Sequence, residues 1–174
     1  MLYTHILVPT DFSPAANQAL RYAFEEAMQH HARLTLLHVT HHYPATEVYY
    51  IAGTPESRSG YAPEMGGKLP SLPTPPPETV RRDYNEEALV QLQDLVPASY
   101  TGPWQTQVAI GDPADAIVRV AQELGVDLIV MATHGHTGLR HVLLGSVAEK
   151  VVRHAPCPVL TVRSRASAAS PGSS

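Results

Sequence analysis

Short apolar runs and longer stretches of helical periodicity alternate along most of the chain. His5–Thr10, Arg33–Thr40 and Leu128–Met131 are apolar runs of strand length, and the last is so continuously apolar that we expect it at the centre of a sheet, covered on both faces. Trp104–Ile110 alternates between apolar and polar residues, which is typical of a strand at a sheet edge. A fifth strand is expected at Pro158–Val162.

Between the strands, apolar residues recur at the spacing of amphipathic helices. Ser13 and Asp112 each precede a proline, and a capping residue followed by proline predicts the start of a helix. Gly125 is placed to end the helix that Asp112 begins. Another helix is expected across Val80–Leu95.

The last helix is expected from about Ser146 to His154. Ser146 and Glu149 have the spacing of a capping box, so we expect the Ser146 side chain to cap this helix. Strands that alternate with helices predict an α/β fold, in which a doubly wound parallel sheet of five strands carries helices on both faces. With the third strand at an edge and the fourth near the centre, the predicted strand order is 3-2-1-4-5.

Two segments depart from this alternation. Residues 43–78 carry eight of the sixteen prolines and show no periodicity, so we interpret them as an inserted loop. Disorder or loose surface packing is the simpler interpretation of this insert, and its tyrosines leave a lid role open as the alternative. Residues 164–174 are rich in Ser and Ala and are expected to form a disordered tail. Residues 1–163 are therefore expected to fold as one domain.

Composition and charge narrow the function classes. The 174 residues include 12 Lys and Arg and 16 Asp and Glu, a formal net charge of −4, without the basic stripe that nucleic-acid binding needs. The amino terminus lacks a signal-peptide pattern and no apolar run is long enough to cross a membrane, so we expect a cytoplasmic protein that binds neither nucleic acid nor membrane. The one cysteine, Cys157, suits a reducing compartment, and we interpret it as a small buried residue and not as a reactive thiol.

The segment 127–147 carries the most informative chemistry. Gly135 and Gly138 follow its apolar run, and the next helix opens at Gly145–Ser146. Glycines let backbone N–H groups approach an anion without interference from a Cβ atom, and a helix start adds unpaired N–H groups and the positive end of its dipole. The pattern predicts a phosphate-binding loop, with ordinary turn glycines as the alternative.

The predicted topology brings a second segment to this loop. The winding of the sheet reverses between the first and fourth strands, and ligands bind beyond the carboxyl ends of the strands at such a reversal. Those ends are Pro9–Asp11 and Met131–Thr133. The Asp11 carboxylate can accept hydrogen bonds from hydroxyls or an exocyclic amine but would repel phosphate, so it suits the nucleoside end of a ligand. Its alternative role is that of a helix-start residue.

On these residues the chain resembles the universal stress protein family, and in particular its ATP-binding branch. The family's nucleotide motif is Gly, two residues, Gly, nine residues, and then Gly followed by Ser or Thr. Ala132 stands at the first position of this motif, Gly135 at the second and Gly145–Ser146 at the last. The other segments that carry the resemblance are Ile-Leu-Val-Pro-Thr-Asp-Phe-Ser from Ile6, Leu-Leu-His-Val from Leu36 and Gly-Asp-Pro from Gly111.

The resemblance implies the adenine nucleotide α-hydrolase-like fold and a set of ligand contacts. It implies adenine near the first and second strands, ribose near Asp11 and Ala132, and phosphates at the glycine loop and the start of the last helix. His136 stands where relatives often carry Arg or Lys, with Arg140 as partial compensation, so we expect ATP binding to tighten on mild acidification. The predicted cofactor-binding residues are Pro9, Thr10, Asp11, Val39, Met131, Ala132, Gly135, Gly145, Ser146 and Val147.

The function that the resemblance implies is that of an adenine-nucleotide-binding regulatory protein of the stress response, which holds ATP, ADP or AMP with or without Mg. The chain lacks a GxxxxGK[ST] loop, so we expect no catalytic residues and at most slow hydrolysis. A ligand-free protein-interaction module stays open as an alternative. So does a slow ATP-using enzyme of the same fold, although the His-x-x-His or Ser-Gly-Gly motif that it would need is missing at Thr10–Ser13.

Two further expectations concern metals and partners. We expect no metal site, because the clustered His38, His41 and His42 have no evident thiolate or carboxylate partner. The family usually dimerises through its last strand, and Val159–Val162 would otherwise be an exposed apolar edge. We therefore expect a homodimer through this strand, together with a protein partner that the sequence does not identify.

Overall fold

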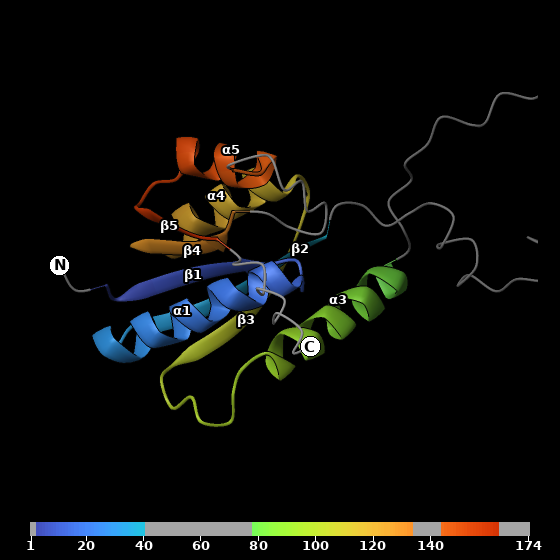
Figure 1. The fold of residues 1–174 in the computed structure, drawn as a ribbon. Coiled ribbons are helices and arrows are strands. Elements are labelled where there is room, and N and C mark those ends of the chain that lie inside the picture. Colours follow the sequence, from blue (N-terminus) through green and yellow to red (C-terminus); the bar gives the residue numbers. More distant parts are fainter. Residues whose placement is uncertain (1–2, 41–77, 134–143, 164–174) are drawn as a thin grey trace, which may run out of the picture.

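One parallel sheet organises the chain (Figure 1). The computed structural model describes residues 3–40, 78–133 and 144–163. The strand order is β3-β2-β1-β4-β5, which confirms the predicted α/β fold and strand order. In chain order the elements are β1 His5–Thr10, α1 Pro14–His30, β2 Arg33–Thr40, α3 Glu78–Asp94, β3 Trp104–Ile110, α4 Pro113–Leu124, β4 Leu128–Ala132, α5 Ser146–His154 and β5 Val159–Val162.

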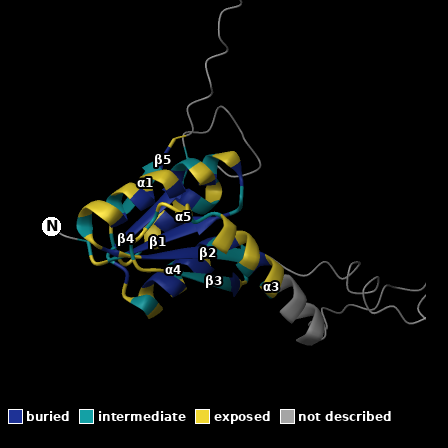
Figure 2. Cartoon of the chain, turned by 90° about the horizontal axis from the view of Figure 1, so that it is seen from below, coloured by how far each residue is buried: buried dark blue, intermediate teal, exposed yellow. Residues whose placement is uncertain are grey.

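Helices cover both faces of the sheet. α1 and α3 pack on one face and α4 and α5 on the other, as Figure 1 shows. In Figure 2, buried residues line the strands and the inward sides of the helices, whereas exposed residues lie on the outer helix surfaces. The central strands are thus shielded from water on both sides, which explains why β4 is continuously apolar.

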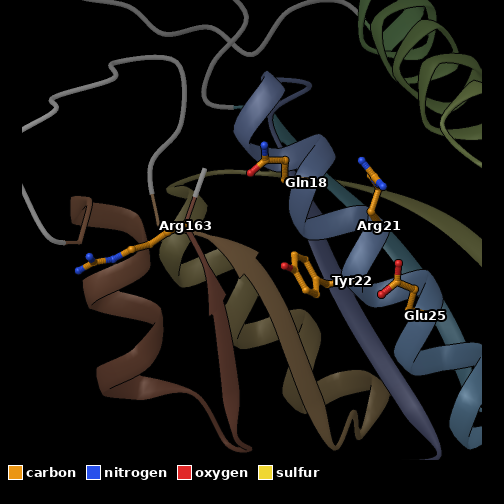
Figure 3. Close-up of a pocket in the computed structure, with 5 residues that line it drawn as sticks. All are labelled: Gln18, Arg21, Tyr22, Glu25 and Arg163. Carbon is orange, nitrogen blue, oxygen red and sulfur yellow. The ribbon is translucent and has the colours of Figure 1, made fainter. Parts of the chain in front are cut away.

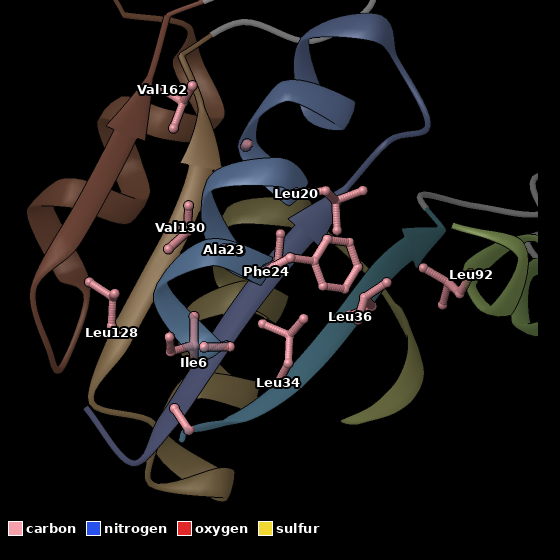
Figure 4. Packing of buried hydrophobic residues seen from close by; sticks show 14 residues of the cluster. Ile6, Leu20, Ala23, Phe24, Leu34, Leu36, Leu92, Leu128, Val130 and Val162 are labelled. Atoms are coloured by element: carbon pink, nitrogen blue, oxygen red, sulfur yellow. The ribbon is translucent and has the colours of Figure 1, made fainter. Parts of the chain in front are cut away.

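The core on the α1 side joins the first helix to three strands. Ile6 of β1, Phe24 of α1 and Leu34 of β2 belong to one buried cluster (Figure 4). Leu92, which is 0% exposed, adds α3 to the same cluster. The remaining labelled residues are Leu20, Ala23, Leu36, Leu128, Val130 and Val162.

A second core lies on the α4 and α5 side. Leu7 contributes to it, whereas its neighbours Ile6 and Val8 contribute to the first core, as the two-residue repeat of a strand requires. Ile117 of α4 and Val151 of α5 close the second core from outside. Every residue of β1 after His5 is therefore buried, and the strand is held rigidly between two packed layers.

Helices α1 and α4 begin as their sequences predict. The Ser13 hydroxyl accepts a hydrogen bond of 3.2 Å from the Ala16 N–H. Asp112 Oδ1 accepts hydrogen bonds of 3.1 and 3.2 Å from two N–H groups in the first turn of α4. Gly125 ends α4 in the left-handed conformation, with φ of 59°. These three local predictions are confirmed.

The start of α5 differs from its prediction. Gly145, and not Ser146, is the N-cap residue, and among the described residues no side-chain hydrogen bond caps this helix. The helix begins one residue earlier than a Ser146 cap requires, because the Glu149 N–H donates to the Gly145 carbonyl at 2.8 Å. The Glu149 carboxylate accepts a hydrogen bond of 2.9 Å from Arg153 instead of reaching back to the helix start. The predicted capping box of Ser146 and Glu149 is therefore wrong.

Two segments predicted from the sequence are not tested by the structure. Apart from Glu78, which begins α3, the predicted insert at 43–78 lies outside the described residues, as does the predicted tail at 164–174. Among the helices that the structure describes, none combines the length and the apolar character needed to cross a membrane.

Candidate functional site

The carboxyl ends of β1, β2 and β4 meet at one edge of the sheet. β1 lies between the other two strands and pairs with β2 along its whole length, from His5 to Thr10. Its pairing with β4, a strand described throughout, ends after Leu7, which lies opposite Ile129. Beyond this pair β1 and β4 separate, at the point where the winding of the sheet reverses. We call this gap between the carboxyl ends of β1 and β4 the open edge.

Pro9 explains why the pairing of β1 with β4 ends there. The Asp127 N–H donates to the His5 carbonyl at 3.0 Å, so the backbone N–H and C=O positions of His5 face β4. By strand alternation, those of Leu7 and Pro9 face β4 as well. Proline has no N–H group. The next hydrogen bond that β1 would donate to β4 is therefore missing, and the sheet opens at a residue that the sequence predicts to contact a ligand.

The strand residues of the predicted set divide between the two faces of the sheet. Val39 and Met131 pack with the core on the α4 and α5 side, whereas Ala132 packs on the α1 side. By strand alternation, Pro9 shares the first of these faces and Thr10 the second. The open edge is therefore lined from both sides of the sheet.

The turn from β1 to α1 is held by its own side chains. The Thr10 hydroxyl accepts a hydrogen bond from the Phe12 N–H, and Asp11 Oδ1 accepts one from the Ser13 N–H, both at 3.0 Å. Phe12 has φ of 63°, a left-handed conformation that is uncommon for a residue with a side chain. Ser13 is the N-cap of α1, and the Asp11 carboxylate supports this helix start because it accepts the Ser13 N–H. Asp11 is half-buried and lies directly after β1, beside the open edge.

The start of α5 is tied to the end of β4. The Gly145 N–H donates to the Thr133 carbonyl at 2.7 Å, and the Thr133 N–H donates to the Val162 carbonyl at 3.0 Å. These two bonds fix the first turn of α5 at the carboxyl ends of β4 and β5. Gly145 has φ of −70°, which any residue can adopt, so the consequence of glycine here is the absence of a side chain.

α5 also differs from α1 and α4 in how it begins. The side chains of Ser13 and Asp112 cap those two helices, whereas α5 receives no side-chain cap from the part of the chain that the structure describes. The N–H groups of Ser146 and Val147 belong to its first turn, where an α-helix offers no acceptor of its own. The dipole of the helix adds a partial positive charge at this end. Such a helix start can bind an anion.

The structure thus brings most of the predicted set to one edge. Gly135 lies outside the described residues, as do His136 and Arg140. The set predicted at the strand ends and found there is Pro9, Thr10, Asp11, Val39, Met131 and Ala132. The set found at the start of α5 is Gly145, Ser146 and Val147.

Sequence reasoning missed two residues of this geometry. Thr133 anchors α5 through its carbonyl group, and no side-chain signal could have revealed a backbone contact. His38 donates from Nδ1 to the Thr10 carbonyl at 2.9 Å. Its place was available in principle, because the predicted strands His5–Thr10 and Arg33–Thr40, aligned in parallel from their amino ends, put His38 opposite Thr10.

The described residues offer little for covalent or metal chemistry. No three His, Cys, Asp or Glu side chains of the described ranges are grouped so that they could hold a metal ion. Burial, and then the nearby Asp127 carboxylate, raise the pKa of the Cys157 thiol. This thiol is therefore protonated near neutral pH and is a poor nucleophile.

Two cavities lined by described residues lie away from the open edge. One, of about 370 Å³, is lined by Gln18, Arg21, Tyr22, Glu25 and Arg163, and Figure 3 shows these side chains along α1 and at the end of β5. The other, of about 380 Å³, lies between α4 and α5. Neither is lined by a residue of the predicted set, so the open edge stands as the candidate site because of its backbone geometry.

Known proteins share both the sequence pattern and the fold. The universal stress protein family matches residues 2–163. Universal stress protein MJ0531 of Methanocaldococcus jannaschii is 32% identical over 162 residues, which cover 93% of this chain and 83% of that relative. Universal stress protein MJ0577 of the same organism is 29% identical over 169 residues, which cover 94% of this chain and 96% of that relative.

Solved structures agree with these sequence matches. The structure of MJ0577 has a TM-score of 0.68 at 27% identity and covers 96% of this chain and 100% of its own. A universal stress protein solved in complex with cAMP has a TM-score of 0.59 at 23% identity, covers 94% of this chain and 98% of its own, and shows the same fold. With a family match that spans every described element, this chain belongs to the universal stress protein family.

Proposed function

We propose that this protein binds an adenine nucleotide, ATP in the first instance, at the open edge between β1 and β4, and that occupancy of this site regulates its conformation or its choice of partner in the stress response. The observation that carries the proposal is the start of α5, which no side chain of the described residues caps and which Thr133 holds beside the opening that Pro9 leaves in the sheet. A relative of the same fold that was solved in complex with cAMP supports an adenine nucleotide as the ligand class.

The two ends of the proposed ligand have different partners. Asp11 suits the nucleoside, because its carboxylate accepts hydrogen bonds from hydroxyl or amino groups and repels phosphate. Pro9, Thr10 and Val39 would surround the adenine, Ala132 would lie near the ribose, and Met131 would line the same strand end. The phosphates would meet Gly135 and the first turn of α5, where the contacts would be Gly145, Ser146 and Val147. Because the Gly145 N–H already donates to Thr133, the amide donors that remain in this turn include those of Ser146 and Val147.

Rapid catalysis is not part of the proposal. Beside the first turn of α5 the nearest acidic side chain in the helix is Glu149, which is engaged by Arg153. Slow hydrolysis of bound ATP is compatible with this arrangement, with or without a Mg ion carried by the phosphates. A regulatory nucleotide site needs occupancy and release, and not turnover.

We propose that the protein acts in the cytoplasm on a protein partner. It would do so as a homodimer paired through β5, Val159–Val162, the strand at one side of the sheet. A dimer through β5 would cover Leu160, whose side chain is 38% exposed in the single chain. Such pairing removes an apolar strand edge that would otherwise invite aggregation.

Calorimetric titration with ATP, ADP and AMP, together with mass spectrometry of nucleotide retained through purification, tests the central claim. We expect saturable binding of one adenine nucleotide per chain and slow or absent release of inorganic phosphate. A protein that gives no binding heat with any of the three and retains none would be the ligand-free interaction module instead. Multiple turnovers of ATP would identify it as an enzyme.

A further inference from the structure

His38 contacts the residues on both sides of Asp11. It stands at the carboxyl end of β2, in register with Thr10 of β1. Its Nδ1 atom donates to the Thr10 carbonyl at 2.9 Å, and its ring lies 4.5 Å from the ring of Phe12, centroid to centroid, at an angle of 37°. A carbonyl oxygen only accepts, so Nδ1 carries the hydrogen of this bond.

The turn that His38 holds is a strained one. A residue with a side chain is disfavoured in the left-handed conformation of Phe12, because its Cβ atom crowds the following carbonyl oxygen. Such a conformation persists only where surrounding contacts enforce it. Here those contacts are the Phe12 N–H bond to the Thr10 hydroxyl, the packing of the Phe12 ring on His38, and its packing on the core of the α1 side.

His38 lies on the α1 side of the sheet. Val39, the next residue, packs on the α4 and α5 side, so strand alternation puts His38 on the α1 side, where Phe12 also packs. The Asp11 carboxylate accepts a hydrogen bond from the Ser13 N–H at 3.0 Å, so its position depends on the conformation of the turn. Two of the three residues Thr10, Asp11 and Phe12 touch His38 directly, and the middle one bears the charge.

We propose that His38 is a positioning residue for the nucleoside end of the site: by holding the Thr10 carbonyl and the Phe12 ring, it fixes the Asp11 carboxylate at the open edge. This inference rests on the proposed nucleotide site and adds to it a residue that does not touch the ligand. A metal-ligating role for His38 would require Nδ1 or Nε2 within a group of ligands, and the described residues contain no such group.

Three substitutions separate the contacts that His38 makes. His38→Ala removes both the donor and the ring. His38→Asn keeps a side-chain N–H that can reach the Thr10 carbonyl, and His38→Phe keeps a ring against Phe12 but has no donor. His154→Ala, at an exposed histidine in the last turn of α5, is the matched control.

Calorimetric titration with two probes, ATP and inorganic triphosphate, supplies a readout that a merely structural role would not move. We expect His38→Ala to weaken ATP binding roughly five- to tenfold, the equivalent of about one hydrogen bond, and to leave triphosphate binding unchanged. His38→Asn recovers most of the ATP affinity, and His38→Phe recovers less. In an Asp11→Ala background, His38→Ala adds no further loss, because the carboxylate that it positions is gone.

The outcomes distinguish this inference from the proposed function. If the wild-type protein binds no nucleotide, the proposed function is wrong and the inference falls with it. If the wild-type protein binds ATP and His38→Ala binds it equally well, or loses ATP and triphosphate affinity in parallel, the inference alone is wrong. Should His38→Ala not fold, equal ATP affinities of His38→Asn and His38→Phe would overturn it in the same way.

Discussion

The amide nitrogen of Gly145 donates its hydrogen to the carbonyl oxygen of Thr133 at 2.7 Å, and this bond joins the start of α5 to the end of β4. It has two consequences for anion binding at this helix. The helix start is held in place by the protein itself, so no ligand is needed to order it. The Gly145 N–H is also occupied, so the first-turn N–H groups that remain without an acceptor in the helix include those of Ser146 and Val147.

Gly145→Asp is predicted to separate stability from ligand binding. The backbone at this position, with φ of −70° and ψ of 159°, is that of an ordinary N-cap, so aspartate fits without strain. Its carboxylate would cap α5 as Asp112 caps α4, and we expect the free energy of unfolding to stay level or rise by about 0.5 kcal/mol. The same carboxylate would occupy the proposed phosphate position and repel the phosphates. ATP affinity should therefore fall at least about tenfold, which corresponds to the loss of one charge-assisted hydrogen bond. Urea unfolding and calorimetric titration measure the two effects.

Two matched variants control this experiment. Gly145→Ala leaves the helix uncapped and uncharged and should bind ATP nearly as the wild type does. Gly145→Asn caps the helix without charge and should bind ATP with an affinity between those of the alanine and aspartate variants. Wild-type ATP affinity in Gly145→Asp would show that the phosphates bind elsewhere.

Pro9→Ala is predicted to narrow the open edge. The new N–H group would face β4 and could extend the pairing of the two strands beyond Leu7 and Ile129. The added hydrogen bond contributes about 1 kcal/mol, which the greater freedom of the unfolded chain offsets by about 0.4–1 kcal/mol, so the stability should change little. ATP affinity should fall, because the crevice between β1 and β4 closes.

Hydrogen exchange checks the Pro9 prediction directly. The new backbone amide that Pro9→Ala introduces should be strongly protected in the free protein, and less so when ATP is bound. If this amide exchanges as fast as an exposed one, the account of why β1 and β4 part is contradicted.

Much of this fold could be predicted because its signals are local. Leu128–Met131 is buried on both faces and therefore continuously apolar, and Ser13 and Asp112 carry their caps in their own side chains. The start of α5 could not be predicted in the same way. Ser146 and Glu149 fit a capping box, and Gly145 is an equally permissible cap, so the choice depends on the tertiary bond from Gly145 to Thr133.

The candidate site was predictable in its residues but not in its cause. Pro9 and Asp11 could be placed beside the winding reversal from the strand order alone. That Pro9 ends the pairing with β4 depends on which peptide groups face that strand, and the sequence does not contain that information. The strain at Phe12 and the contacts of His38 likewise arise only when β1 and β2 are in register.

His5 is predicted to make the fold less stable in mild acid. Its Nε2 atom lies 2.8 Å from the hydroxyl oxygen of the fully buried Thr35. Burial and then the charge of Arg33 lower the pKa of His5 from its usual 6.5, against the opposing effects of the Leu124 carbonyl and the Asp127 carboxylate. Because the unfolded chain then takes up the proton more readily than the folded one, this contribution is fully present above pH 6.5 and is lost as the pH falls toward and through the lowered folded pKa.

Urea unfolding at about pH 7.5 and about pH 5.5 measures the His5 effect, because Asp127, whose pKa lies below its usual 3.8, stays ionised across that window. His5→Gln should be less stable than the wild type at the higher pH and should lose less stability on acidification. Identical pH dependence in His5→Gln and the wild type would show that another group carries the effect.

Leu160→Lys is predicted to convert a dimer into a monomer. Leu160 lies on β5, an edge strand of the sheet, and its side chain is 38% exposed. A lysine there adds charge to the apolar edge and disfavours pairing with a second copy, while it leaves the buried cores intact.

Ile110→Lys is the matched control, since Ile110 lies on the opposite edge strand, β3, and is 43% exposed. Light scattering should give a dimer mass for the wild type and the control and a monomer mass for Leu160→Lys. A monomer mass for the wild-type protein at every concentration would refute pairing through β5, and a dimer that survives Leu160→Lys but not Ile110→Lys would move the interface to β3.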